Sequence, residues 1–228
     1  MRLERWTGCS ALAFAAVTIG VVVSEAAGPD ITASPAQVAA KLSSHRSDVL
    51  VNSALHTVQG IAALILSAAV AALLASRSRH LAAYGVFGFG LTTATASLVS
   101  AVSSATAASS IHQVTDPQAP YLLYRGAQAA GMADTIFFAG LVLVFALELT
   151  RSALLPRASA PAGAVVAVIF FVGGFDYLSP DSGPLSGVRA LGGVLAVLYI
   201  LVTGVALLRQ GAAGNPEGQP ARAGTVQR

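Results

Sequence analysis

Four polar residues lie deep inside long apolar stretches of the sequence. Asn52, His56 and Gln59 are four and three residues apart, so one face of a helix carries all three. At ~1.5 Å rise per residue, Asp134 lies roughly 20 Å from either end of its stretch, and Gln59 about 15 Å from the start of its own. The two therefore share a depth near the membrane midplane. In an apolar, partly dry site, the imidazole of His56 and the carboxyl of Asp134 could exchange a proton near neutral pH, and the amides could bind a polar solute.

The surroundings of Asp134 indicate that it faces other helices. The residues three, four and seven positions before it are all small: Gly131, Ala130 and Ala127. Small residues let helices approach closely in a membrane, so the carboxylate is expected in the core of a bundle. His56 and Gln128 form a candidate second layer above Asp134 and Gln59, nearer the outer side.

Two interpretations of these residues remain open. In the first, Asn52, His56, Gln59 and Asp134 line a polar cavity that binds a small solute, a lipid headgroup or a proton. In the second, they form interhelical hydrogen bonds with a structural role only, and each bond stabilises the bundle by about 0.6 kcal/mol on average. The Ala-, Ser- and Thr-rich segment 92–110 is weakly apolar for a lipid-facing helix. We expect it at the centre of the bundle, with its hydroxyls bonded to neighbouring helices.

Other chemistry has less support. Asp176 and Arg189 flank the connection between the last two apolar stretches and form a candidate ion pair. Bis-histidine haem needs two histidines inside the bundle, and only His56 lies there. No cluster has zinc spacing, and no glycine-rich phosphate loop or nucleophile elbow occurs outside the apolar stretches. We therefore expect no cofactor and no metal, and we lean against an enzyme.

The elements that would position these residues are membrane-spanning helices. Of the 228 residues, 55% are hydrophobic and 10% are charged, against about 25% charged residues in soluble domains. A span needs roughly 20 apolar residues. The sequence predicts an all-α bundle of about six spans, at 6–27, 49–75, 81–109, 121–149, 158–178 and 188–208. The net charge of +3 comes from scattered residues, which argues against nucleic acid as a partner.

The basic residues indicate an orientation. Of 13 Lys and Arg residues, nine fall on the side of the N-terminus: Arg2, Arg5, Arg77, Arg79, Arg151, Arg157, Arg209, Arg222 and Arg228. The positive-inside rule then predicts that both termini are cytoplasmic. The first stretch could instead be a signal peptide cleaved near Ser24-Glu25-Ala26. Its apolar part exceeds the roughly 7–15 residues of that class, so a retained helix is favoured. The single cysteine, Cys9, is expected to be a small buried thiol.

Two segments outside the spans have their own patterns. In the outer loop 28–48, Ser34 or Thr32 can cap a short helix over 35–42, with Pro35 in its first turn. Val38 and Leu42 would share one face of it, on the membrane surface or over the mouth of the bundle. The six-helix domain covers 1–209. The tail 210–228 is rich in Gly, Pro, Gln and Arg and is expected to be disordered.

The layout resembles a large, uncharacterised family of bacterial six-span membrane proteins that is common in actinobacteria. The resemblance rests on Ser44-His45-Arg46 before the second span, the basic turn 76–80, Leu154-Leu155-Pro156-Arg157, and Gly173-Gly174-Phe175-Asp176-Tyr177-Leu178. It implies the fold and a bacterial inner-membrane location, and it brings no activity with it.

The leading hypothesis is a protein that binds or transports a small molecule or lipid. The alternative is a non-catalytic membrane scaffold that docks other proteins through the small-residue surfaces of the third and fourth spans. An intramembrane enzyme ranks third. Beyond the lipid bilayer, the sequence names no partner and no oligomeric state.

Overall fold

The computed structural model describes residues 3–24, 33–113, 116–178 and 184–213, and over these ranges the chain is helical apart from short connections. The helices are α1 (Leu3–Ser24), α2 (Pro35–Ser44), α3 (Arg46–Ala75), α4 (His80–Ser110), α5 (Gln118–Arg151), α6 (Ser159–Gly173), η2 (Gly174–Leu178) and α7 (Pro184–Ala213). Within the described ranges, six helices are long and apolar enough to cross a membrane: α1, α3, α4, α5, α6 with part of η2, and α7. The predicted six-span bundle is confirmed.

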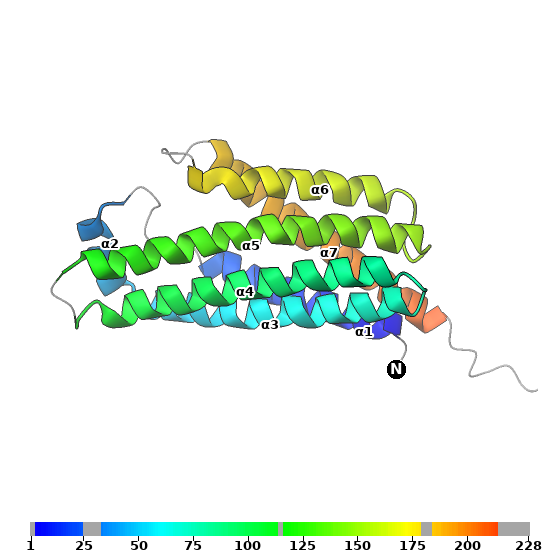
Figure 1. Cartoon of the computed structure of the whole chain (residues 1–228), viewed down its shortest axis with the longest axis horizontal. Coiled ribbons are helices and arrows are strands. Elements are labelled where there is room, and N and C mark those ends of the chain that lie inside the picture. Colours follow the sequence, from blue (N-terminus) through cyan, green and yellow to red (C-terminus); the bar gives the residue numbers. More distant parts are fainter. Residues whose placement is uncertain (1–2, 25–32, 114–115, 179–183, 214–228) are drawn as a thin grey trace, which may run out of the picture.

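The spanning helices form a closed ring in chain order. Each packs against the next one, and α1 packs against α7, which joins the two ends of the chain. Figure 1 shows the helices aligned along the long axis of the molecule, with the short helix α2 at one end. We call this end the α2 end, and the opposite end, where Glu148 lies, the Glu148 end. A residue on the axis of the ring is therefore surrounded by protein.

Glycines allow the backbones in this ring to approach closely. A Cβ atom on Gly8 of α1 would lie 2.7 Å from the carbonyl oxygen of Gly204 on α7. A Cβ atom on Gly90 of α4 would overlap the side chain of Ser67 on α3. Packing of small residues is a main source of helix association in membranes, so these positions hold α1 to α7 and α3 to α4.

The half of the bundle toward the Glu148 end has an apolar core. It contains residues from all six spanning helices, among them Phe14, Val70, Val86, Phe145, Val166 and Leu207. The buried hydroxyls of Thr7 and Ser67 in this half donate to backbone carbonyl oxygens.

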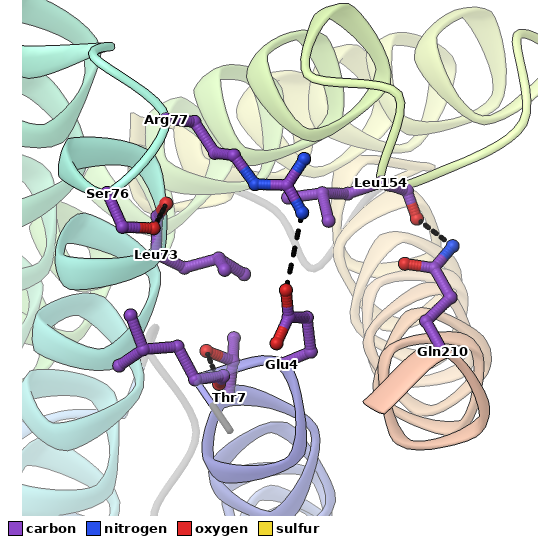
Figure 2. A network of polar contacts seen from close by, with 8 residues as sticks. Glu4, Thr7, Leu73, Ser76, Arg77, Leu154 and Gln210 are labelled. Atoms are coloured by element: carbon purple, nitrogen blue, oxygen red, sulfur yellow. Dashed lines mark hydrogen bonds and ion pairs between the residues drawn. The ribbon is translucent and has the colours of Figure 1, made fainter. Parts of the chain in front are cut away.

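Polar contacts tie the connections together at the Glu148 end. Figure 2 shows Arg77 directed at Glu4 of α1, with Arg77 Nη2 3.3 Å from Glu4 Oε1. In the same view, Gln210 Nε2 of α7 donates to the carbonyl oxygen of Leu154, at 2.7 Å. Each contact joins segments that are distant in sequence. They fix the connections α3–α4 and α5–α6 against the terminal helices.

Glu148 carries a buried charge at this end. Its side chain accepts hydrogen bonds from Arg79, at the start of α4, and from Arg151, one turn further along α5. Two guanidinium groups compensate one carboxylate here, as a buried charge requires.

Several expectations from the sequence need correction. The segment 92–110 is not central: it belongs to α4, whose Leu98, Val99 and Val102 are exposed on the outside of the ring. The hydroxyls of Thr92, Thr95 and Thr106 donate to carbonyl oxygens four residues earlier in the same helix. A hydroxyl satisfied in this way tolerates an outward position. Only Ser97, among the hydroxyls with a described hydrogen bond in this segment, bonds to a neighbouring helix as expected. Cys9 is exposed rather than buried.

The helix expected in the loop 28–48 is present as α2. Ser34 is its N-cap, and the Ser34 and Gln37 side chains form a reciprocal capping box. Val38 and Leu42 are buried against α3, α4 and α5, so α2 lies over the end of the bundle. Most of the tail expected to be disordered, and the cleavage site expected near residues 24–26 apart from Ser24, lie outside the described residues.

Candidate functional site

A cavity of about 510 Å³ lies among the helices in the half of the bundle nearer α2. All six spanning helices contribute to its wall, and the four predicted residues Asn52, His56, Gln59 and Asp134 all line it. Gln128 and the predicted pair Asp176 and Arg189 line it too. Its volume is within the range of about 300–1,000 Å³ that is usual for small-molecule sites.

Helix α1 determines how Asn52 is oriented. Asn52 Nδ2 donates to Ser24 Oγ at 2.7 Å and to the Val21 carbonyl oxygen at 3.4 Å. The Ser24 hydroxyl donates its one proton to the Val21 carbonyl oxygen, so it can only accept a hydrogen bond from Asn52. The amino group of Asn52 is therefore fixed toward α1. Its carbonyl oxygen is the atom that remains to accept a hydrogen bond.

The same arrangement recurs two turns deeper. Gln59 Nε2 donates to Thr18 Oγ1 at 3.3 Å, and the Thr18 hydroxyl donates to the Phe14 carbonyl oxygen at 2.9 Å. The amino group of Gln59 thus faces α1. Its Oε1 atom is buried and accepts no hydrogen bond from the residues that the structure describes. Leaving such an atom unsatisfied costs about 1–3 kcal/mol, which favours a hydrogen-bond donor in the cavity.

Asp134 is held by a hydroxyl of the neighbouring helix. Ser97 Oγ of α4 donates to Asp134 Oδ2 at 2.9 Å. Thr93 lies one turn before Ser97 and Ser100 nearly one turn after it, and both line the cavity. The side chain of Thr93 is 2% exposed, and its hydroxyl has no hydrogen-bond partner within the described ranges. A row of hydroxyls on α4 therefore borders the carboxylate.

The rim of the cavity has its own charged groups. Arg189 Nε of α7 lies 3.7 Å from Asp176 Oδ2 of η2, and the Asp176 side chain is buried. Gly173 allows this: a Cβ atom there would lie 2.5 Å from the Arg189 Cα atom. On α5, Arg125 Nη1 donates to Gln128 Oε1 at 3.2 Å. The Arg189 guanidinium is thus matched by a carboxylate at the rim.

Three aromatic rings lie in the wall of the cavity on the side of the apolar core. Phe14 of α1 and Phe138 of α5 have ring centroids 5.2 Å apart, and Phe138 and Phe170 of α6 are 5.7 Å apart. All three also belong to the apolar core or pack against it. We call these three residues the aromatic floor. The polar wall ends there.

At the other side, helix α2 packs against residues that line the cavity. Its buried residues Val38 and Leu42 share one apolar cluster with Val49 and Tyr124, and the last two also line the cavity. The position of α2 is therefore coupled to the shape of the cavity near its end.

The cavity also contains groups that the sequence did not reveal. Thr18 and Ser24 orient the two amides, and the aromatic floor bounds the cavity. Phe14 and Thr18 are four residues apart in an apolar stretch, so the sequence places them on one helix face. This spacing is the one sequence feature that could have predicted their common position.

Comparison of the chain with protein-family models, with curated proteins and with solved structures gives no match. The resemblance to the actinobacterial family stays a prediction.

Proposed function

We propose that this protein binds a small molecule in the cavity lined by Asn52, His56, Gln59 and Asp134. The observation that carries the proposal is the orientation of Gln59. Its amino group is committed to Thr18, and its buried carbonyl oxygen is left without a donor from the described residues. If these residues were only interhelical hydrogen bonds, both ends of the amide would be expected to bond to protein.

The distribution of Lys and Arg residues supports an opening of the cavity on the outer side of the membrane. With the N-terminus in the cytoplasm of a bacterial cell, the positive-inside rule places the α2 end outside the inner membrane. The cavity would then receive its ligand from the outer side. If the protein also transports its ligand, the path from the cavity to the Glu148 end has to open during a cycle of alternating access. The residues of the aromatic floor would then separate, and the contacts of Glu4 and Glu148 would break.

The scaffold alternative has less support. It relied on small residues of α4 and α5 serving between chains, and several of them pack within this chain. A Cβ atom on Gly60 of α3 would lie 3.1 Å from the Ala94 carbonyl oxygen of α4, and one on Gly131 of α5 would lie 3.6 Å from Ser100 Oγ. These contacts favour an internal role for the small residues.

Access of solutes to the cavity tests the proposal. In a Cys9→Ser background, Ser100→Cys places a thiol in the cavity wall, whereas Val70→Cys places one in the apolar core. A hydrophilic thiol reagent added to the purified full-length protein should modify the first variant and leave the second unmodified, as measured by intact mass. If both thiols resist while Ser47→Cys, which is exposed at the start of α3, reacts, the cavity admits no solute and the proposal is wrong.

A further inference from the structure

We infer that the ligand of this cavity is a small organic cation, with an ammonium group that binds at Asp134 and an apolar body that lies on the aromatic floor. The inference rests on the proposed binding function and specifies the class of molecule.

Carboxylates outnumber guanidinium groups in the wall of the cavity. The lining residues include three carboxylates, on Asp48, Asp134 and Asp176, and one guanidinium, on Arg189. Arg189 is next to Asp176. When Arg125 at the rim is included and His56 is neutral, these charges sum to a negative value. In a site with limited water, this charge attracts cations and repels carboxylates and phosphates.

The polar wall of the cavity presents hydrogen-bond acceptors. Helix α1 binds the amino groups of Asn52 and Gln59 and leaves their oxygens as acceptors. Asp134 adds a carboxylate at the depth of Gln59. An ammonium group has three donors and no acceptor, so it complements these oxygens. An anion has only acceptors and would leave them unsatisfied. The buried Thr93 hydroxyl adds a further group without a partner in the described part of the chain.

The spacing of Asp134 and Phe138 along α5 places the carboxylate and the aromatic floor next to each other. Asp134 and Phe138 are four residues apart on α5 and lie on one face, about 6 Å apart along the helix axis. A cation within about 6 Å of a ring centroid is attracted by the face of the ring. Phe14 and Phe170 extend the apolar surface beyond Phe138. An amine that carries a phenyl-sized group two carbons away would fit both parts.

The test uses two thiol reagents of opposite charge on Ser100→Cys in the Cys9→Ser background. These are 2-aminoethyl methanethiosulfonate, a cation, and 2-sulfonatoethyl methanethiosulfonate, an anion. The rate ratio of cation to anion at Ser100→Cys is divided by the ratio at the exposed Ser47→Cys. We expect a preference for the cation of at least about tenfold, because a unit charge several ångströms away interacts strongly at an effective dielectric constant of about 20. Asp134→Asn, which keeps the shape, should remove most of it.

Protection by added amines then identifies the ligand class. A ligand with a Kd of about 1 mM, present at about 10 mM, slows modification about tenfold. We expect this slowing with 2-phenylethylamine, and none with 2-phenylethanol or 3-phenylpropionate.

The outcomes separate the inference from the function on which it rests. Equal modification by both reagents, or equal protection by the alcohol, overturns the organic cation while binding stands. A cation preference that survives Asp134→Asn overturns the role of Asp134. If Ser100→Cys is not modified at all, the proposed function itself fails. Elution of the Asp134→Asn variant as one species, with Val70→Cys still resistant, shows that its fold is retained.

Discussion

The Ser97 hydroxyl of α4 donates a hydrogen bond of 2.9 Å to Oδ2 of Asp134 on α5. Ser97 is 1% exposed, whereas Asp134 is only partly buried and lines the cavity. The hydrogen bond links the carboxylate at the deep part of the cavity to the neighbouring helix. The packing of α4 against α5 therefore sets the position of the Asp134 carboxylate. Replacing Ser97 tests how much this hydrogen bond stabilises the bundle and leaves the carboxylate in place for binding.

Replacing Ser97 should destabilise the bundle slightly. We expect Ser97→Ala to lower the free energy of unfolding by about 0.6 kcal/mol, the average for interhelical hydrogen bonds in a membrane protein. In an Asp134→Leu background the same change should cost nearly nothing, because the acceptor is gone. Unfolding in mixed micelles, followed by circular dichroism, measures both values. Equal costs in the two backgrounds would show that the hydrogen bond contributes nothing.

Gly90 and Gly88 are a matched pair on α4. A Cβ atom at Gly90 would overlap Ser67 of α3, whereas a Cβ atom at Gly88 meets nothing within 4 Å. Overpacking costs typically 1–3 kcal/mol, so Gly90→Ala should lower the free energy of unfolding by about that amount. Gly88→Ala should be neutral or slightly stabilising, because alanine is the better helix former. Similar thermal stabilities for the two variants would mean that α3 and α4 are not held in close contact at Gly90.

The two arginines beside Glu148 should differ in importance. Arg79 joins the α3–α4 connection to α5, and its side chain is 40% exposed, whereas Arg151 belongs to the same helix as Glu148 and is 61% exposed. Loss of an exposed partner four residues away or less costs little, about 0.5 kcal/mol. We expect Arg79→Ala to cost more, about 1–2 kcal/mol, because the buried carboxylate then loses its link to another helix. Mixed-micelle unfolding of both variants compares them, and a larger cost for Arg151→Ala would contradict the assignment.

The spans and the polar face of α3 could be predicted because their signals are local. Hydrophobic length marks a span, and the spacing of Asn52, His56 and Gln59 marks one helix face. Asp134 was identified by its cost in lipid and by its small neighbours. In each case the information lies within one or two turns of the same helix.

The remaining features depend on which helices are neighbours. Thr18 and Ser24 orient the two amides only because α1 packs beside α3, and Gly8 can serve ring closure only because α7 returns to α1. No local pattern states these pairings. The position of α4 was predicted wrongly for a related reason: composition alone does not tell whether a threonine hydroxyl bonds to its own helix or to another one.

Helix α2 should undock when its apolar anchor is shortened. Leu42 is fully buried against the end of the bundle, whereas its neighbour Ser43 is exposed. Shortening a buried leucine to alanine costs about 2–5 kcal/mol. We expect Leu42→Ala to speed hydrogen exchange throughout α2 and to leave the exchange of α5 unchanged, while Ser43→Ala changes neither. Mass-resolved hydrogen exchange measures this, and slow exchange in α2 of Leu42→Ala would show that the helix is held by other contacts.

The first span should be retained in the mature protein. Helix α1 lies between α3 and α7, and its residues Phe14 and Thr18 line the cavity. Removal of α1 would open the ring and expose the buried faces of α3 and α7, which would lose much apolar burial. Gln59 would also lose the Thr18 hydroxyl that orients its amide. Purified protein should therefore show an intact mass near 22.9 kDa. A loss of mass that matches residues 1–26 would identify a cleaved signal peptide, and five spans would then have to form the cavity without α1.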